Sequence, residues 1–222
     1  KGDREKGGNG SSRRKSKGTI FNRIYTSALS VLHHCGQVEQ TMLFLNRVLD
    51  GVDDRPFEPP TEAVVRDFFN LALTTCSKRK QYRVALSLIQ DMEHRGARPD
   101  IISYNSLISA AGKNGEDARK AFEMIRTKGL RPDLISYNTV MGAVAGNKKE
   151  WRETFKYMDL IRLDPMVRPD VITYTCIIKA HGTGGEGAKA LRTLGVMKDK
   201  GIEPDAFVYT SAINACAKDR GR

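Results

Sequence analysis

The stretch RPDIISYNSLISAAGKNGEDARKAFEMIRTKGLRPDLISYN, from Arg98 to Asn138, carries the same motif at both of its ends. Its opening RPD, two further residues and SYN return after one full unit as RPD, two residues and SYN. The motif recurs as RPD with TYT at residues 168–175 and as EPD with VYT at residues 203–210. The four tyrosines of the motif are 33, 37 and 35 residues apart: Tyr104, Tyr137, Tyr174 and Tyr209. Internal repetition at a period of roughly 20–50 residues is typical of a repeat solenoid.

The composition of the chain limits its partners and its compartment. The net charge is +11, and residues 1–18 contribute +5 of it through seven Lys/Arg against two Asp/Glu. A basic balance favours a polyanionic partner without identifying it. The four cysteines (Cys35, Cys76, Cys176 and Cys216) are far apart and form no C-x-x-C pair. This argues against a zinc ribbon or a disulfide framework and fits a reducing compartment. We see no secretory signal and no apolar run of about 18 residues, so we expect no membrane span.

The repeat frame divides the chain into seven segments. We expect a disordered basic tail at 1–18, since Gly, Ser and charged residues cannot bury enough surface to become ordered; a basic arm lying on RNA phosphates is the alternative. We expect segment 19–65 to form a degenerate first repeat with an acidic, Pro-rich loop insertion at 50–60. The remaining segments are four repeats and the first helix of an incomplete one: 66–100, 101–133, 134–170, 171–205 and 206–222. Because the chain does not begin with Met and its last unit is incomplete, we expect a processed chain or a portion of a longer one.

Each unit reads as a hairpin of two amphipathic helices. In the unit 101–133, Tyr104, Leu107, Ile108 and Ala111 follow the i, i+3, i+4, i+7 spacing of one helix face, and Ala118, Ala121, Phe122 and Ile125 repeat that stripe after the turn at 112–115. A hairpin cannot cover its apolar face alone, so neighbouring units stack into an array. We therefore expect an all-α solenoid, with the four motif tyrosines in its core.

Departures from the common length fall in loops. Units 101–133 and 134–170 are short at the turn between their helices, and the second regains residues in the loop at 161–166. Thr61 and Glu62, after two prolines, resemble a helix start, so the first helix of the unit 66–100 is expected to begin early, near 61. The single helix of 206–222 leaves its packing face open, and we expect further protein or a partner to cover it.

Read with its first residue after Pro-Asp, the unit has the pattern V-x-T-Y-N-x-L-I…A-x-x-x-F-x-x-M-x-x-x-G-x-x-P-D. This resembles the pentatricopeptide repeat, clearly over residues 66–217 and weakly over 22–65. The nearest rival, the tetratricopeptide repeat, has a Trp-x-x-Leu-Gly-x-x-Tyr pattern. The single tryptophan, Trp151, is expected in a second helix, which does not fit that pattern. The resemblance implies a right-handed α-solenoid of about five to six units. Its first helices would line a groove for single-stranded RNA, with one base read per repeat.

The resemblance also implies which residues select each base: the fifth residue of a unit, assisted by the last. The implied pairs are Asn70 with Asp100, Asn105 with Asp133, Asn138 with Asp170, and Thr175 with Asp205; Thr26 and Thr210 are further selectors without clear partners. In the family, Asn with Asp prefers U and tolerates C, whereas Thr with Asp prefers G. An amide offers a donor and an acceptor to a pyrimidine edge, and a threonine leaves room for a purine. The implied core preference is 5′-UUUG-3′.

Two further sets of residues follow from the resemblance. The second residue of each unit would sandwich the bases, and this place is held by Ile102, Ile135, Ile172 and Phe207. Asp67 departs from the apolar pattern, which puts the 5′-most U in doubt. A lysine thirteen residues into the unit would contact phosphate, and Lys78, Lys113 and Lys218 match, whereas Gly146 and Thr183 do not. Fewer phosphate contacts predict weaker affinity and a shallower salt dependence.

Each of these residues also has an ordinary structural explanation. An Asp after Pro commonly caps a helix or shapes a turn, and Asn or Thr near a helix start needs no RNA. His33, His34 and Cys35 point in different directions on a helix, so we expect no metal site. The glycine-rich stretch 182–187 lies between two helices without a preceding strand or Gly-Lys-Ser/Thr, so we reject a phosphate-binding loop. We expect no cofactor.

The sequence thus favours an RNA-binding protein without catalysis of its own, since no nucleophile–base pair or carboxylate cluster stands out. The family resemblance implies a mitochondrion or chloroplast as its location and RNA processing, stability or translation as its role. One alternative is a scaffold subunit of a large ribonucleoprotein assembly such as an organellar ribosome, with protein subunits as partners. Another is the RNA-binding part of a longer RNA-processing enzyme.

Overall fold

The structure is a computed structural model that describes residues 27–28, 30–31, 37–50 and 61–219. The predictions for the tail 1–18, for Thr26, for the sequence His33-His34-Cys35 and for most of the loop 50–60 lie outside these residues. All regular secondary structure that the structure describes is helical, which confirms the all-α prediction. The labelled helices are α2 (Val38–Asp50), α3 (Glu62–Arg79), α4 (Tyr82–His94), α5 (Ile101–Ala110), α6 (Gly115–Thr127), α7 (Leu134–Ala145), α8 (Glu153–Leu163), α9 (Val171–Gly184), α10 (Gly187–Asp199) and α11 (Ala206–Asp219).

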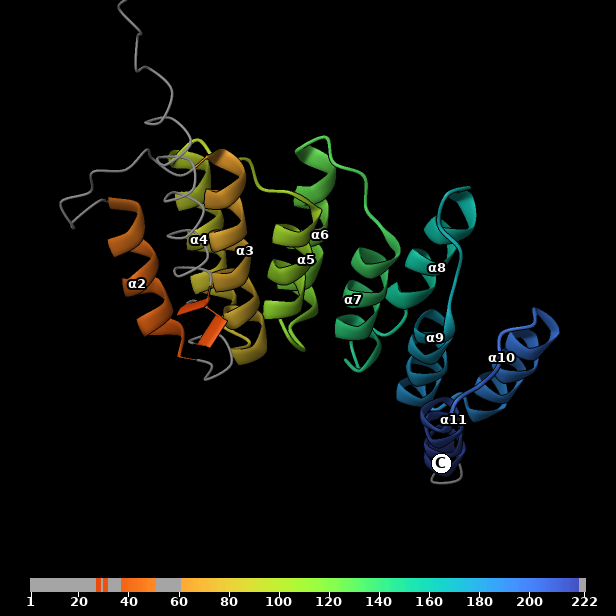
Figure 1. The fold of residues 1–222 in the computed structure, drawn as a ribbon. Helices are drawn as coiled ribbons and strands as arrows, with labels where there is room; N and C mark the ends of the chain where they lie inside the picture. Colours follow the sequence, from red (N-terminus) through yellow and green to blue (C-terminus); the bar gives the residue numbers. More distant parts are fainter. Residues whose placement is uncertain (1–26, 29, 32–36, 51–60, 220–222) are drawn as a thin grey trace, which may run out of the picture.

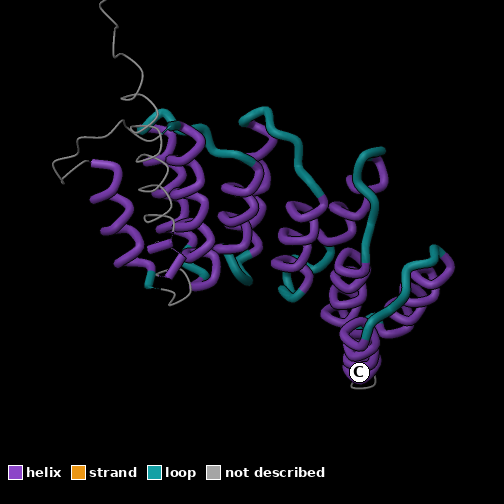
Figure 2. Tube along the Cα trace, in the orientation of Figure 1, coloured by secondary structure: helices purple, strands orange, loops and turns teal. Residues whose placement is uncertain are grey.

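The helices stack as a solenoid of two rows (Figure 1). Helices α3, α5, α7, α9 and α11 each contact the next and form the first-helix row. Each of α4, α6, α8 and α10 packs against the first helix of its own unit and that of the following unit, and these four form the second-helix row. Helix α2 packs on α3 at the amino-terminal end. The loops between successive helices alternate between the two edges of the stack (Figure 2).

The recurring Pro-Asp pair starts the first helix of a unit. Asp100, Asp133 and Asp170 are the N-cap residues of α5, α7 and α9, and each forms a reciprocal capping box with the residue three positions later. The preceding proline lacks an N–H and disfavours a helical residue before it, so it separates one unit from the next. Helix α3 begins at Glu62 after the N-cap residue Thr61, which confirms the early start, although the Thr61 side chain makes no capping hydrogen bond.

The second helices end in two different ways. Gly129, after α6, has a φ of +72°, a left-handed conformation that glycine adopts without a Cβ penalty. Helix α8 has no such glycine. There Asp164 accepts a hydrogen bond from the Met166 N–H at 3.0 Å and pairs with Arg131. These two interactions outweigh the cost of desolvation and hold the pKa of Asp164 below its ordinary value. An ionised carboxylate thus fixes the longer loop that the sequence places at 161–166.

The predicted stripes form one continuous core. Tyr104, Tyr137 and Tyr174 are buried as expected, at 1%, 7% and 2% exposure. The ring of Phe122 lies 5.2 Å from those of both Tyr137 and Tyr157, so it connects two successive units. The prediction for Tyr209 is wrong, because this side chain is 40% exposed. No second helix follows α11 in the described chain, and the Nζ of Lys198 lies over the ring at 5.4 Å from its centre.

The prediction for Trp151 is also wrong. This residue lies in the turn before α8, not within a second helix. It is 6% exposed and packs with Ala145, Ala180 and Phe155 as a small cluster beside the main core. The turn at 146–152 therefore brings a large aromatic side chain to a place where the sequence pattern indicates only a shortened connection.

The described residues show neither a membrane-spanning helix nor a metal-binding cluster. Not one of their helices has both the length and the apolar character needed to cross a membrane. The same residues contain no cluster of three or more His, Cys, Asp or Glu side chains suited to a metal ion.

Candidate nucleic-acid interface

Asn105, on α5, is held in place by the start of the next first helix. Its amide Nδ2 donates to Asp133 Oδ1 at 3.1 Å, and its Oδ1 accepts from Ser136 Oγ at 2.6 Å. Asp133 is the last residue of the same unit, and Ser136 is the third residue of the next one. Two side chains of the following helix start thus fix one asparagine.

The same arrangement occurs one unit earlier and one unit later. The amide-to-carboxylate distance is 3.3 Å for Asn70 and Asp100, and 3.0 Å for Asn138 and Asp170. The hydroxyl-to-amide distances are 2.6 Å from Ser103 to Asn70 and 2.7 Å from Thr173 to Asn138. The structure therefore brings together three of the four residue pairs that the sequence predicts as selectors.

This network determines what each asparagine can offer to a ligand. Because the hydroxyl occupies one lone pair of Oδ1 and the carboxylate takes one N–H of Nδ2, the orientation of the amide is set by its partners. One N–H and one lone pair remain on each amide. A fixed donor beside a fixed acceptor complements the edge of a pyrimidine such as uracil, which presents an N–H next to a carbonyl oxygen.

The aspartates combine the structural role with the predicted one. Asp133 Oδ1 accepts from the Ser136 backbone N–H at 2.8 Å, which caps α7, and also from the amide of Asn105. The capping explanation is therefore confirmed at the three Asn-containing sites, and the contact between Asn and Asp is present, whereas their part in base selection stays a prediction. Asp100 and Asp170 make the equivalent bonds at 3.0 Å and 2.9 Å.

A line of exposed apolar side chains accompanies these amides. Ile102, Ile135, Ile172 and Phe207 are 55%, 61%, 58% and 67% exposed, although each is large and apolar. Each lies three residues before the fifth residue of its unit, so the two share one face of a first helix. Exposed apolar residues repeated along one row indicate a binding surface. Asp67 is exposed at the equivalent place on α3.

The fourth predicted pair is built differently. The hydroxyl of Thr175 donates to the backbone oxygen of Val171 at 2.7 Å, within its own helix, and no bond joins it to Asp205 in the described structure. Asp205 is exposed and accepts from the Val208 N–H at 2.8 Å. Since Val208 has no hydroxyl, the third partner of the network is missing here. Thr210 likewise donates to its own helix, at the Ala206 oxygen, at 2.8 Å.

The three predicted phosphate-contacting lysines are all exposed. Lys78, Lys113 and Lys218 lie at or just after the ends of α3, α5 and α11, and none of them forms an ion pair with another described residue. Their ammonium groups are therefore free for an anion. Gly146 stands at one of the two places where this lysine is missing. The side chain of Lys179 lies near it, with Nζ 3.3 Å from where a Cβ of residue 146 would be.

Cys176 follows Thr175 on α9 and is buried at 7% exposure. Burial raises the pKa of its thiol to about 11. The group is therefore neutral at physiological pH and packs against the unit before it, with Sγ 3.9 Å from the Asn138 oxygen. A neutral buried thiol is a packing group and not a nucleophile.

Sequence reasoning missed two features of this face. The hydroxyl residues Ser103, Ser136 and Thr173 complete the network. The sequence feature that could have indicated them is a hydroxyl residue at the third position of three units. The second feature is an ion pair between Arg66 and Asp100 at 3.4 Å, which gives the first site a cation that the other two lack. The fold brings the first and last residues of that unit together, and their spacing in the sequence does not indicate it.

The comparisons with known proteins agree with this geometry. A model described as the pentatricopeptide repeat domain matches residues 87–148, and one described as the PPR repeat family matches residues 169–218, about half of the chain together. A pentatricopeptide repeat-containing protein of Arabidopsis thaliana, named chloroplastic, is 27% identical over 206 residues, or 91% of this chain and 19% of that protein. Another from Arabidopsis thaliana is 43% identical over 53 residues, or 24% of this chain and 10% of that protein. The chain thus spans a fifth or less of these relatives.

Solved structures with the same fold include two bound to RNA. The pentatricopeptide repeat protein PPR10 in complex with an 18-nt psaJ RNA element matches 88% of this chain and 28% of that one, with a TM-score of 0.65 and 21% identity. The PPR domain of Arabidopsis thaliana protein-only RNase P 1 in complex with tRNA matches 70% of this chain and 82% of that one, with a TM-score of 0.57 and 13% identity. At these identities the similarity establishes the solenoid fold alone.

Proposed function

The chain belongs to the pentatricopeptide repeat family, and from this we propose that it binds single-stranded RNA along its first-helix row. The observation that carries the proposal is the repeated pair of an exposed apolar side chain and a fixed amide, as at Ile102 and Asn105. An apolar side chain can pack on a base, and the amide can bond its edge. RNA bound to PPR10 and to the PPR domain of protein-only RNase P 1 supports this class of ligand.

The finer proposal is one base per repeat. Asn70, Asn105 and Asn138, each with its aspartate, read U, and Thr175 with Asp205 reads G, so the preferred core is 5′-UUUG-3′. The fixed amides of the first three sites support the pyrimidine assignment through their remaining donor and acceptor. The first U is the least well recognised, because Asp67 lies where an apolar residue would pack on it.

Lys78, Lys113 and Lys218 supply phosphate contacts in this proposal. They are few, and each neutralised phosphate adds roughly 0.7 to the slope of log affinity against log salt on a single strand. A shallow dependence is therefore expected. The chloroplastic names of two relatives support an organelle as the site of action, and processing, stabilisation or translation of an organellar RNA is the proposed role.

The test is selection from a randomised single-stranded RNA pool with the whole chain at about 150 mM salt, where nonspecific phosphate binding is weak. Enrichment of a core matching 5′-UUUG-3′ supports base reading in this frame. Binding without any enriched core leaves only a basic surface. No binding at all favours the alternative of a protein-binding scaffold within a ribonucleoprotein assembly.

A second candidate is the RNA-binding part of a longer RNA-processing enzyme. The matched PPR domain of protein-only RNase P 1 is a repeat domain of such an enzyme by name. This candidate shares the RNA face with the first, so the same selection tests its binding half. Cleavage of the selected RNA by the full-length protein would distinguish this second candidate from a protein that only binds RNA.

A further inference from the structure

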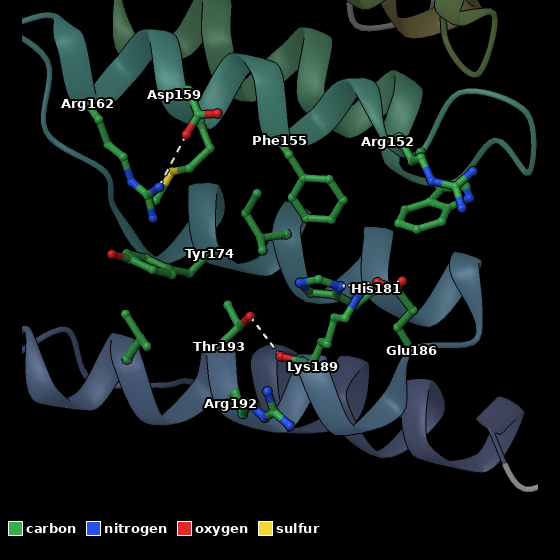
Figure 3. A pocket seen from close by; sticks show the side chains of 14 residues that line it. Arg152, Phe155, Asp159, Arg162, Tyr174, His181, Glu186, Lys189, Arg192 and Thr193 are labelled. Carbon is green, nitrogen blue, oxygen red and sulfur yellow. Dashed lines mark hydrogen bonds and ion pairs between the residues drawn. The ribbon is translucent and has the colours of Figure 1, made fainter.

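A groove runs between α8 and α10 on the second-helix row (Figure 3). Helix α8 and the turn before it form one wall, α10 forms the other, and Tyr174, Ile177 and His181 of α9 form the floor. The groove encloses about 550 Å³, within the roughly 300–1,000 Å³ that ligand pockets span. It lies among second helices, whereas the proposed RNA face lies on the first-helix row. A ligand in this groove would therefore bind apart from the proposed RNA face.

The aromatic side chains at one end of the groove are packed on one another. The ring of Phe155 lies 5.8 Å from that of Trp151 and 4.8 Å from that of His181. The guanidinium of Arg152 covers Trp151 at 4.5 Å from the ring centre. A Cβ at residue 184 would lie 2.5 Å from the Trp151 ring, so Gly184 is what allows this close packing. The buried Trp151 ring, covered by Arg152, therefore offers no platform on which a nucleobase could stack.

The charges of the groove leave a positive excess. Asp159 pairs with Arg162 at 3.2 Å, and Glu186 pairs with Lys189 at 2.8 Å. Partial burial alone would raise the pKa of Glu186, but hydrogen bonds from Lys189 and His181 outweigh it and hold the pKa below its ordinary value. Both acids are thus already neutralised by their own cations.

Two exposed arginines on opposite walls account for the excess. Arg152 and Arg192 have no carboxylate partner among the described residues, and both line the groove. Figure 3 shows Arg152 over Trp151 at one end of the groove and Arg192 on α10. Two unpaired guanidinium groups flanking an apolar groove are complementary to carboxylates, which they bind in a bidentate manner.

Tyr174, on the floor of the groove, has a buried hydroxyl. The side chain is 2% exposed, and its oxygen has no hydrogen-bond partner in the described structure. Tyr104, at the equivalent place in an earlier unit, is also buried with no hydrogen-bond partner for its hydroxyl among the described residues, and burial, with Glu93 nearby, raises its pKa to about 12. Tyr174 has Arg162 nearby instead. A buried hydroxyl without a partner costs roughly 1–3 kcal/mol, and because Tyr104 shares this state, it is a feature of the repeat and not of this groove alone.

The groove between α6 and α8 is a natural comparison within the same chain. It has a similar volume, about 640 Å³, and is formed by the preceding pair of second helices. Its charges are balanced: Lys120 pairs with Glu116 at 2.7 Å, and Lys156 pairs with Glu153 at 2.7 Å. A third cation, Arg119, is paired with Glu150 at 3.0 Å. The positive excess is therefore a property of the α8/α10 groove and not of every groove in the second-helix row.

We propose that the α8/α10 groove binds an acidic peptide segment of a partner protein. An apolar side chain of the peptide packs against Phe155, Met158 and Val196, and its carboxylates pair with Arg152 and Arg192. From Arg152 to Arg162 the wall runs for about three helical turns, or roughly 15 Å, which four or five extended residues span. Val196, at 41% exposure, supplies open apolar surface on the α10 wall.

The experiment is selection of a random dodecapeptide display library on the whole chain, with the double variant Arg152→Glu/Arg192→Glu as counter-selection. The matched control is Lys120→Glu/Lys156→Glu, which makes the same change in net charge in the α6/α8 groove. Trp151 is the single tryptophan, so its fluorescence reports directly on occupation of the groove by a selected synthetic peptide.

The proposal expects acidic peptides with an apolar residue, a change in Trp151 fluorescence, and affinity that falls by about tenfold or more in Arg152→Glu/Arg192→Glu but not in the control. Circular dichroism confirms that both variants are folded. The proposal is overturned if the peptides show no acidic bias, or if they bind the groove variant equally well. It is also overturned if a U-rich RNA oligonucleotide, and no peptide, loses affinity in the groove variant, because the groove would then bind RNA and not a peptide.

Discussion

Asn105 and Thr175 occupy the same place in two units of one solenoid, yet their side chains have different hydrogen-bond partners. Asn105 is tied to Asp133 and Ser136 of the next helix start. Thr175 bonds back to its own helix, and Asp205 caps α11 without it. The same repeat frame therefore produces two kinds of site, one held by its neighbour and one independent of it.

The difference depends on the third residue of the following unit. Where this residue carries a hydroxyl, as in Ser136, it bridges the asparagine, the aspartate and the backbone of the cap. Val208, at the equivalent place, is buried and can do none of this. An asparagine at the fifth place and a hydroxyl at the third place of the next unit thus act together, so the proposed base selection would depend on the same bonds as repeat stacking.

The largest effect of this difference is expected in stability. Asp133→Ala removes the N-cap of α7 and the acceptor of the Asn105 amide, so we expect a loss of about 2–3 kcal/mol from a cap and an unsatisfied partly buried donor. Asp205→Ala removes one exposed cap and is expected to cost about 1 kcal/mol. Urea denaturation followed by helical circular dichroism measures both.

Asp133→Asn is the matched control for this pair. Asparagine is as good an N-cap as aspartate, and its oxygen retains the bonds, so most of the lost stability should return. Equal losses in Asp133→Ala and Asp205→Ala would show that the network adds nothing beyond a cap.

The next effect concerns the base that the fourth site is proposed to select. Thr175→Asn combined with Val208→Thr supplies the missing amide and hydroxyl, so it should rebuild the network of Asn138, Asp170 and Thr173 at α9 and α11. We expect the preference at that base to move from G to U by about tenfold, within the roughly 1–3 kcal/mol of one discriminating contact. Affinities for RNAs that differ only at this base provide the measurement.

The single variants separate the contributions of the two residues. Thr175→Asn alone should move the preference toward U by a smaller factor, because no hydroxyl fixes its amide. Val208→Thr alone should leave the preference unchanged. If the double variant discriminates no differently from the unmodified chain, the fifth residue is not the selector.

The period and the helix faces were predictable because they depend on local spacing. Burial of Tyr104, Tyr137 and Tyr174 follows from their place on one helix face, and the starts of α5, α7 and α9 follow from the capping Asp after each proline. The ends of the array were less predictable: Tyr209 is exposed because burial depends on a following helix. Trp151 was misplaced because the turn at 146–152 has no helical spacing to indicate it.

The candidate RNA face was partly predictable and the outer groove was not. Family resemblance indicates Asn105 and Asp133, but the bond from Ser136 joins residues 31 apart in the chain. The sequence contains the hydroxyl residue without showing where it points. The α8/α10 groove depends on the separation of two helices and on which cations lack partners, such as Arg192, and neither is a property of local sequence.

The smallest effect is expected from removing one hydroxyl from the network. Ser136→Ala keeps the backbone N–H bond to Asp133 and the Asn105–Asp133 bond, but it removes the hydroxyl's bonds with the Asn105 amide oxygen and with the Asp133 N–H. The amide is then less constrained, so we expect U to lose about threefold to fivefold of its advantage over A and G at that base, with a stability cost of about 1 kcal/mol. Ser136→Thr, which keeps a hydroxyl as Thr173 does, should restore both quantities. A Ser136→Ala variant with full discrimination would mean that the aspartate alone orients the amide, and the contrast between Asn105 and Thr175 would then come from the fifth residue and not from the third.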